Sequence, residues 1–288
     1  MNSHPILAVH LHLYYTDMWG LLKKRLQHLE GCNYDLYVTL VESAPELEAE
    51  IRAFHPQSEI WLVENRGYDV GPFITVLHRI DLSAYDLVLK LHSKSLRAGT
   101  LAWINRRCVS RKWWCRLMLD SLLGTPKQVQ HNMRRFCDAP QLGMLGAAQL
   151  IVEHPSHQTK VHELLRQVMR KLGYRHWKFR FVAGTMFMVR SCILQKIKEN
   201  FQPHDFSPTL AEVSDGTLAH ALERAFGCLT LAEGYTLEGT GYSLRFELAA
   251  LGTAIWQFLY KKKITKKNKL LIKICRIPVF SCRRTPHR

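Results

Sequence analysis

The stretch EIWLVENRGYDVGPFITVLHRIDLSAYDLVLKLHSKSL, residues 59–96, decides the fold. It holds two short apolar runs, residues 60–63 and 86–91, and between them apolar side chains recur at helical spacing, at Phe73, Val76, Leu77 and Ile80. A strand, a helix and a second strand in this order form the repeating unit of a parallel sheet. Ligands bind beyond the carboxyl ends of the strands in such sheets. The polar and glycine residues that follow both runs therefore mark the candidate site.

The same alternation extends toward the N-terminus. Apolar runs at residues 6–13 and 35–41 predict two further strands, and residues 45–54, which open with proline and early glutamates, predict a helix. A helix with Trp19, Leu22, Leu26 and Leu29 on one face fits between the first two strands. The pattern is typical of a doubly wound nucleotide-binding half. We predict an α/β fold with a central, mostly parallel sheet flanked by helices.

The second half of the chain is less regular. Residues 97–144 are basic and aromatic and predict mostly helix. Further strands are expected at residues 142–151, 179–189 and 229–232, and helices at 161–172 and from Asp215 to Gly227. Gly184 interrupts one of these strands, which indicates close approach of the backbone to a ligand or another segment.

Composition and charge restrict the function further. The chain has 288 residues, is 47% hydrophobic and carries a formal charge of +16, so it can build a large core and is not a disordered chain. Eleven Lys and Arg lie from residue 261 onward and no acid follows Glu247, which leaves about +5 for the rest. The eight cysteines show no zinc spacing and are expected as free thiols in a reducing cytoplasm. We predict no signal peptide and no transmembrane helix.

The C-terminal residues combine apolar and basic side chains. We divide the chain into a domain at residues 1–250 and a basic, amphipathic tail at residues 251–288. Such a tail fits an anionic membrane surface, where aromatic and apolar groups insert and cations attract lipid headgroups. The alternative is a disordered, solubilising tail, against which the apolar content argues.

Five motifs in order carry a family resemblance. They are VHLHLYYTDMW (9–19), NRGYDVGPF (65–73), YDLVLKLHSK (85–94), AGTMFMVR (183–190) and DGTLAHALERAFG (215–227). With these motifs the chain resembles the rhamnan synthesis F family, bacterial proteins implicated in making rhamnose-containing polysaccharides. The resemblance runs from about residue 6 to about residue 245.

That family in turn looks like the glycosyltransferases of the GT-A fold, which transfer sugars from nucleoside diphosphates. The resemblance implies a GT-A-like nucleotide-diphospho-sugar transferase fold for this chain. In that fold the fourth strand usually ends in two metal-binding carboxylates, but here His92, Ser93 and Lys94 stand there. No cofactor or metal site is therefore assigned, although the fold leaves Mg²⁺ or Mn²⁺ possible. We hypothesise that Lys94, His92 and Arg66 replace the metal as fixed cations.

The resemblance also implies roles for individual residues. Asp215 is the candidate general base, with Glu212 second. The donor-binding candidates follow strand ends or interrupt a strand, and are His12, Tyr14, Glu42, Asn65, Arg66, Gly67, Asp69, Lys90, His92, Lys94, Gly184 and Thr185.

Structural roles remain open alternatives for several of these residues. Asp215 fits a helix N-cap equally well. Asp69 contacts either the donor or Arg66, His92 is either a ligand contact or a hydrogen-bonded structural histidine, and His12 and Tyr14 either line the base pocket or pack in the core.

The function that the resemblance implies is sugar transfer with inversion, from a nucleotide-sugar to a lipid-linked cell-surface polysaccharide. The family name suggests rhamnose as the sugar. Such a protein is expected in the cytoplasm, peripheral on the inner face of the bacterial plasma membrane. Two rival functions are a catalytically inactive scaffold of a polysaccharide assembly complex and a nucleic-acid-binding protein. The nucleic-acid-binding function rests on a sequence pI of about 9.6. The small net positive charge outside the tail argues against nucleic acid as a partner.

Overall fold

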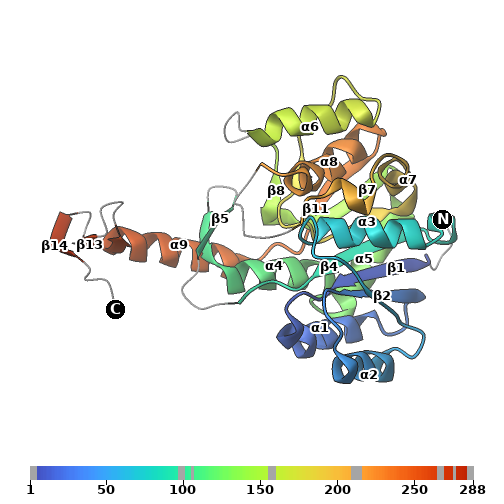
Figure 1. Cartoon of the computed structure of the whole chain (residues 1–288), viewed down its shortest axis with the longest axis horizontal. Coiled ribbons are helices and arrows are strands. Elements are labelled where there is room, and N and C mark those ends of the chain that lie inside the picture. The colour runs from blue at the N-terminus through green and yellow to red at the C-terminus, as the bar shows by residue number, and fades with distance from the viewer. Residues whose placement is uncertain are drawn as a thin grey trace. The chain divides into compact units, whose positions relative to one another are not determined.

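The computed structural model describes residues 5–96, 101–104, 107–154, 160–208, 216–264, 269–274 and 277–283 (Figure 1). Contacts divide the chain into two units. The first consists of Met1–Leu96 and Cys115–Tyr242, and the second of Arg97–Trp114 and Ser243–Arg288.

A sheet of seven strands forms the centre of the first unit. Its order is β11-β7-β10-β4-β1-β2-β3, and among these strands only β10 runs antiparallel to its neighbours. The bounds are β1 Leu7–His12, β2 Tyr34–Leu40, β3 Glu59–Leu62, β4 Leu87–His92, β7 Leu142–Ala147, β10 Phe187–Arg190 and β11 Thr236–Thr240. The predicted α/β fold with a mostly parallel sheet is confirmed.

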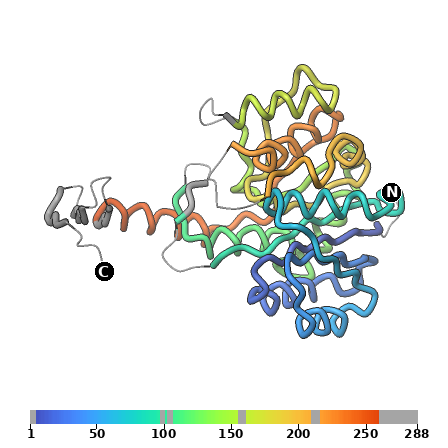
Figure 2. The backbone as a smooth tube through the Cα atoms, in the orientation of Figure 1, coloured from blue at the N-terminus to red at the C-terminus, as the bar shows by residue number. Residues whose placement is uncertain are grey.

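Helices cover both faces of this sheet. One face shares a hydrophobic core with α3 Val70–Arg79, α6 Lys160–Lys171, α7 Ser191–Asn200 and α8 Leu218–Ala232. Figures 1 and 2 show α1 Trp19–Leu26 and α2 Pro45–Phe54 on the other side of the sheet. Trp19, Leu22 and Leu26 of α1 are buried, as their helical spacing predicts. The unit also contains α5 Pro126–Asp138 and the short strands β8 Ile151–Val152 and β9 Phe181–Val182.

Two local predictions in the first unit are wrong. The strand expected at residues 229–232 is the last turn of α8, which continues through Gly227 instead of ending there. A Cβ at Gly227 would lie 2.3 Å from the carbonyl oxygen of Arg180, so this glycine permits close packing and does not stop the helix. Strand β3 is also less buried than its apolar run predicts, because it is the edge strand and leaves Leu62 53% exposed.

The second unit contains a hairpin that the sequence patterns do not predict and a helix that begins before the predicted tail. β5 Leu101–Ile104 and β6 Arg107–Ser110 pair antiparallel in a region expected to be mostly helical. They are followed by α4 Arg111–Leu123, which belongs to the first unit from Cys115 onward. Helix α9 Leu244–Leu259 begins before the predicted tail boundary and packs with β6, where Arg107 Nε donates to Glu247 Oε2 at 2.7 Å.

Three antiparallel strands end the described part of this unit. They are β12 Tyr260–Ile264, β13 Lys269–Ile274 and β14 Ile277–Arg283, in the order β12-β13-β14. Within the described residues, every helix is too short or too polar to cross a membrane.

The packing at Gly227 gives a stability prediction. Gly227→Ala forces a methyl group against backbone atoms of residues 180 and 181, and we expect it to lower the free energy of unfolding by about 1–3 kcal/mol. Gly20→Ala in α1 is the matched control, since a Cβ there has no atom within 4 Å. This control should be neutral or stabilising by up to about 1 kcal/mol. Urea unfolding followed by circular dichroism measures both, and equal stability of the two variants would contradict the close-packing account.

Candidate functional site

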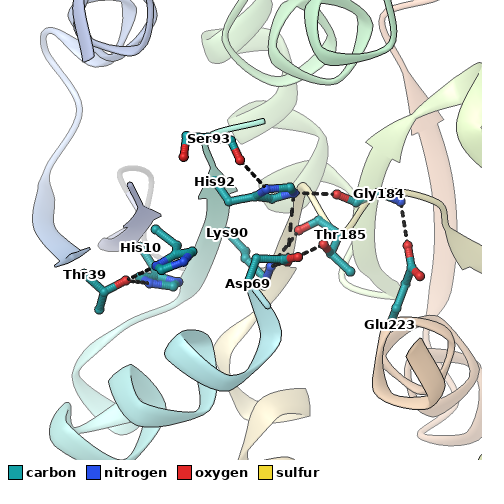
Figure 3. A network of polar contacts seen from close by, with 10 residues as sticks. His10, Thr39, Asp69, Lys90, His92, Ser93, Gly184, Thr185 and Glu223 are labelled. Atoms are coloured by element: carbon teal, nitrogen blue, oxygen red, sulfur yellow. Dashed lines mark hydrogen bonds and ion pairs between the residues drawn. The ribbon is translucent and has the colours of Figure 1, made fainter. Parts of the chain in front are cut away.

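The sheet brings several predicted residues to the carboxyl ends of its central strands. In the strand register His12 of β1 lies beside both Thr39 of β2 and His92 of β4, and Lys90 lies beside Phe187 of β10. Because β10 runs antiparallel, the turn that precedes it, with Gly184 and Thr185, reaches the same edge. Figure 3 shows Thr39, Lys90, His92, Gly184 and Thr185 together with Asp69, which precedes α3.

An ion pair between Lys90 and Asp69 lies at the centre of this group. The Lys90 side chain is 0% exposed, and its Nζ donates to Asp69 Oδ2 and to the carbonyl oxygen of Thr185 at 3.1 Å. The Thr185 hydroxyl donates to the same Asp69 oxygen at 2.5 Å. The Nζ also lies 5.4 Å from the centre of the Phe73 ring. A buried lysine is tolerated only where its charge is paired and hydrogen-bonded, and these contacts supply both.

The protonation of this pair follows from its surroundings. Burial alone would raise the pKa of Asp69, but His92, Lys90 and Lys94 together lower it well below its usual range. Burial lowers the pKa of Lys90, against the opposing effect of Asp69. We take the pair as ionised near neutral pH, because a carboxylate held by an ammonium group and a hydroxyl stays charged.

One oxygen of Asp69 remains available at this edge. The described contacts of the carboxylate all use Oδ2, and its side chain is 19% exposed. Among the described residues, no partner of Oδ1 is found. An ionised carboxylate oxygen in a partly exposed position accepts hydrogen bonds from hydroxyl groups strongly.

His92 fixes the neighbouring turn. Its Nε2 lies 2.8 Å from the carbonyl oxygen of Gly184, and its Nδ1 lies 3.0 Å from the carbonyl oxygen of Ser93. Burial lowers the pKa of His92 to about 4, so the ring is neutral near pH 7 and has one N–H to donate. Burial therefore argues against His92 as one of the three fixed cations, whereas the carbonyl oxygens beside both ring nitrogens favour the protonated form.

The turn at Gly184 and Thr185 has an unusual backbone. Both residues have positive φ, 96° and 53°, and this region is strongly disfavoured for a β-branched residue such as Thr185. Besides the bonds to His92, Lys90 and Asp69, the Gly184 N–H donates to Glu223 Oε1 at 2.7 Å. Such conformations persist where surrounding contacts enforce them, and they concentrate at functional sites.

Two more histidines lie beneath this turn. His10 Nε2 and His12 Nδ1 each lie 3.0 Å from the Thr39 hydroxyl oxygen, and the His10 ring stacks on Phe73. Burial lowers the pKa of His12 to about 3 and that of His10 well below its ordinary value. They therefore form a neutral, polar layer of the core.

The remaining predicted residues divide into two groups. Lys94 is partly buried, and burial lowers its pKa against the opposing charges of Asp69 and Glu223, so its charge acts on this cluster. Tyr14 is 47% exposed and contacts Tyr15 edge to face. Glu42 is exposed and Asn65 half-buried; neither contacts the Lys90–Asp69 pair.

Arg66 serves another purpose than pairing with Asp69. It forms an ion pair with Glu64 and donates to the carbonyl oxygen of Phe206 at 3.1 Å, and it forms a β-bridge with Pro208. Gly67 lies so close to Phe206 that a Cβ would be 2.4 Å from its ring. Asp69 pairs with Lys90, so both sequence-based alternatives for Asp69 missed this partner.

Asp215 and Glu212 lie outside the described residues. Both flanks of their segment contact the loop that carries Asp69, since Arg66 binds Phe206 and Pro208 on one side. On the other side the Tyr68 ring lies 5.4 Å from that of His220, in the first turn of α8.

Sequence reasoning missed Glu223 and Thr39. Glu223 lies four residues after Ala219 and three before Phe226, both buried, so helical spacing places this carboxylate on the inner face of α8. Thr39 lies near the end of β2, beside His10 and His12. It is uncharged, so nothing in the sequence marks it as a site residue.

The described residues do not fit a divalent metal of the usual GT-A kind. Within the part of the chain that the structure describes, no group of three or more His, Cys, Asp and Glu is placed to hold a metal. Mg²⁺ and Mn²⁺ prefer carboxylate oxygens, whereas Asp69 is held by Lys90 and the end of β4 offers His92 and Lys94.

The fold defines an α/β protein with a mostly parallel sheet, and ligands of such sheets bind beyond the carboxyl ends of the strands. The chain belongs to the Rhamnan synthesis protein F family, whose model matches residues 1–235. This confirms the resemblance seen in its motifs.

Two relatives are both described as "Uncharacterized protein WxcX", from Xanthomonas campestris pv. campestris strains B100 and ATCC 33913. Each is 27% identical over 246 residues, which cover 80% of this chain and 32% of the relative. The chain therefore spans about a third of the length of these curated relatives.

Among solved structures, the chain is similar to S. aureus TarS residues 1–349, with a TM-score of 0.41, 10% identity and coverage of 82% of this chain and 58% of TarS. Another is glucosyl-3-phosphoglycerate synthase from Mycobacterium tuberculosis in complex with Mn²⁺ and UDP-glucose. It has a TM-score of 0.39 and 12% identity, and covers 98% of this chain and 90% of its own.

The buried pair gives a double-mutant prediction. Lys90→Met leaves Asp69 charged without its partner and should cost about 3–5 kcal/mol of unfolding free energy. Adding Asp69→Asn removes the orphaned charge, so the double variant should recover part of this loss. Chemical denaturation of the wild type, both single variants and the double variant measures the coupling. Strictly additive losses would show that the two groups do not interact.

The pKa of His92 gives a pH prediction. The pKa of His92 in the folded chain, about 4, lies below the ordinary 6.5. Between these two pH values His92 therefore binds a proton in the unfolded chain but not in the folded chain. His92 should therefore reduce stability as pH falls from about 6.5 to 4. Histidine ¹⁵N NMR, with His92→Gln for assignment and the urea-unfolded chain as control, should find a neutral ring at pH 5.5. A His92 signal that titrates near 6.5 in the folded protein would contradict this.

Proposed function

We propose that this protein is a glycosyltransferase that moves a sugar from a nucleotide-sugar donor to a lipid-linked cell-surface polysaccharide, with rhamnose as the candidate sugar. Membership of the Rhamnan synthesis protein F family supports polysaccharide synthesis as the setting. The observation that carries the proposal is the ionised Asp69 carboxylate, whose Oδ2 is fixed by Lys90 and Thr185 and whose Oδ1 has no partner among the described contacts. Sugars and ribose present the hydroxyl donors that such an oxygen accepts.

The reaction places two demands on the site. An acceptor hydroxyl oxygen attacks the anomeric carbon, and the bond from that carbon to the diphosphate oxygen breaks. The diphosphate leaves with the bonding electrons, and a base takes the acceptor proton. A single displacement of this kind inverts the anomeric carbon. General-base help contributes about 10²–10⁴-fold, and fixed charge near the leaving group contributes several kcal/mol.

Lys94 is our candidate for the charge on the leaving diphosphate. Lys90 is engaged with Asp69 and burial lowers the pKa of His92, so we assign this role to Lys94, which follows β4. Asp69 and Glu223 favour its charged form against burial. Arg66, which the sequence also suggested, is engaged with Glu64 and Phe206.

Asp215, with Glu212 second, stays our candidate for the base. The support is that the loop with Asp69 contacts both flanks of their segment, at Pro208 and His220. We place the reaction on the cytoplasmic face of the plasma membrane, where a lipid-linked acceptor is accessible.

The experiment is a screen of nucleotide-sugars for thermal stabilisation, followed by transfer assays with the stabilising donor and a lipid-linked acceptor. Lys94→Ala should lower turnover by about 10²–10³-fold, while Lys24→Ala, at an exposed position on α1, should not. EDTA should leave turnover unchanged, because the described site offers a lysine where a metal would bind. The mechanism would be contradicted if the Lys94→Ala variant turned over as fast as the wild type, or if EDTA abolished activity. Donor binding without any transfer would favour the inactive scaffold instead.

A further inference from the structure

Helix α9 exposes one apolar face along its whole length. Its apolar stripe consists of Leu244, Leu248, Leu251, Ile255 and Leu259, which are between 44% and 65% exposed. Successive members are three or four residues apart, so they lie above one another on a single face. Monomeric proteins rarely leave contiguous apolar surface of this kind in water, and such surface marks an interaction site.

The opposite face of α9 is already in use. Phe246 and Ala250 are buried there, the helix packs with β6, and Glu247 pairs with Arg107. After Glu247 no charged residue occurs until Lys261. The stripe therefore faces away from the contacts that hold α9 within its own unit, and beyond Glu247 its flanks carry no charge to keep it in water.

Positive charge follows the helix directly. The register of the sheet places Lys261 opposite Lys273 and Lys269 opposite Arg283. Like charges at directly opposite positions destabilise an antiparallel pair. Since no acidic residue follows Glu247, the counter-charge for these strands must come from outside this part of the chain.

We propose that the apolar stripe of α9 and the basic strands after it dock together on an anionic lipid bilayer. The stripe inserts at the boundary between headgroups and acyl chains, and the lysines and arginines attract the lipid phosphates. A second copy of the chain fits less well in a parallel seam, because that seam would bring two sets of basic strands together. A paired seam also commonly uses charges beside it, whereas here Ala249, Gly252 and Ala254 stand there. Docking on a membrane through this surface is a role separate from the proposed transfer reaction.

The test is flotation of the full chain with vesicles of phosphatidylcholine, with and without phosphatidylglycerol, in the absence of donor and acceptor. The wild type should float with the anionic vesicles, and less so at high salt. Leu248→Gln with Leu251→Gln should weaken binding at least about tenfold, since two leucines no longer leave water. The matched control is Leu21→Gln with Leu62→Gln, at exposed leucines on α1 and β3, and should bind like the wild type.

Three outcomes overturn the proposal. They are equal binding of both double variants, no flotation of the wild type, and a wild-type dimer that the α9 variant alone dissociates without any vesicle binding. The last outcome would assign the stripe to a second copy. Because no sugar donor is present, each of these results leaves the proposed transfer reaction untouched.

Discussion

The candidate site depends on one buried ion pair. Lys90 stands on a central strand with no exposed surface, and such a lysine is stable there only because Asp69 and the Thr185 carbonyl accept hydrogen bonds from it. The pair in turn holds Asp69 ionised and directs one of its oxygens to the edge of the sheet. A carboxylate that is fixed and charged before a ligand arrives needs little rearrangement to bind hydroxyl groups.

The same pair helps to maintain a strained backbone. Thr185 would not adopt positive φ in a free chain, but its carbonyl oxygen and hydroxyl both belong to the Lys90–Asp69 network. Glu223 and His92 hold the preceding glycine from two further elements. Strand β4, helix α8 and the loop before α3 thus converge on a two-residue turn. The polar groups here support one another, so the loss of one contact weakens the others.

The sequence predicted the location of this site better than its chemistry. Alternating strands and helices place Asp69, Lys90 and His92 at one edge, because the carboxyl ends of parallel strands meet there. The charge states of these residues could not be predicted from the sequence. Burial lowers the pKa of His92, and Lys90 pairs with Asp69, which lies 21 positions away. Gly227 shows a similar limit in predicting the fold. A glycine at this position predicts a helix end from local sequence, but in the structure the helix continues and the glycine allows close packing on Arg180. Glu223 is not predicted, because apolar spacing identifies the buried face of a helix but does not single out a carboxylate on that face.

The most direct test of this account is a crystal structure of the protein with a bound nucleoside diphosphate sugar. The account predicts a hydroxyl group of the donor within hydrogen-bonding distance of Asp69 Oδ1, with Lys90 still on Oδ2 and the diphosphate beside Lys94. A donor bound away from the carboxyl ends of β1 and β4, or a divalent metal seated on Asp69 in place of Lys90, would contradict it.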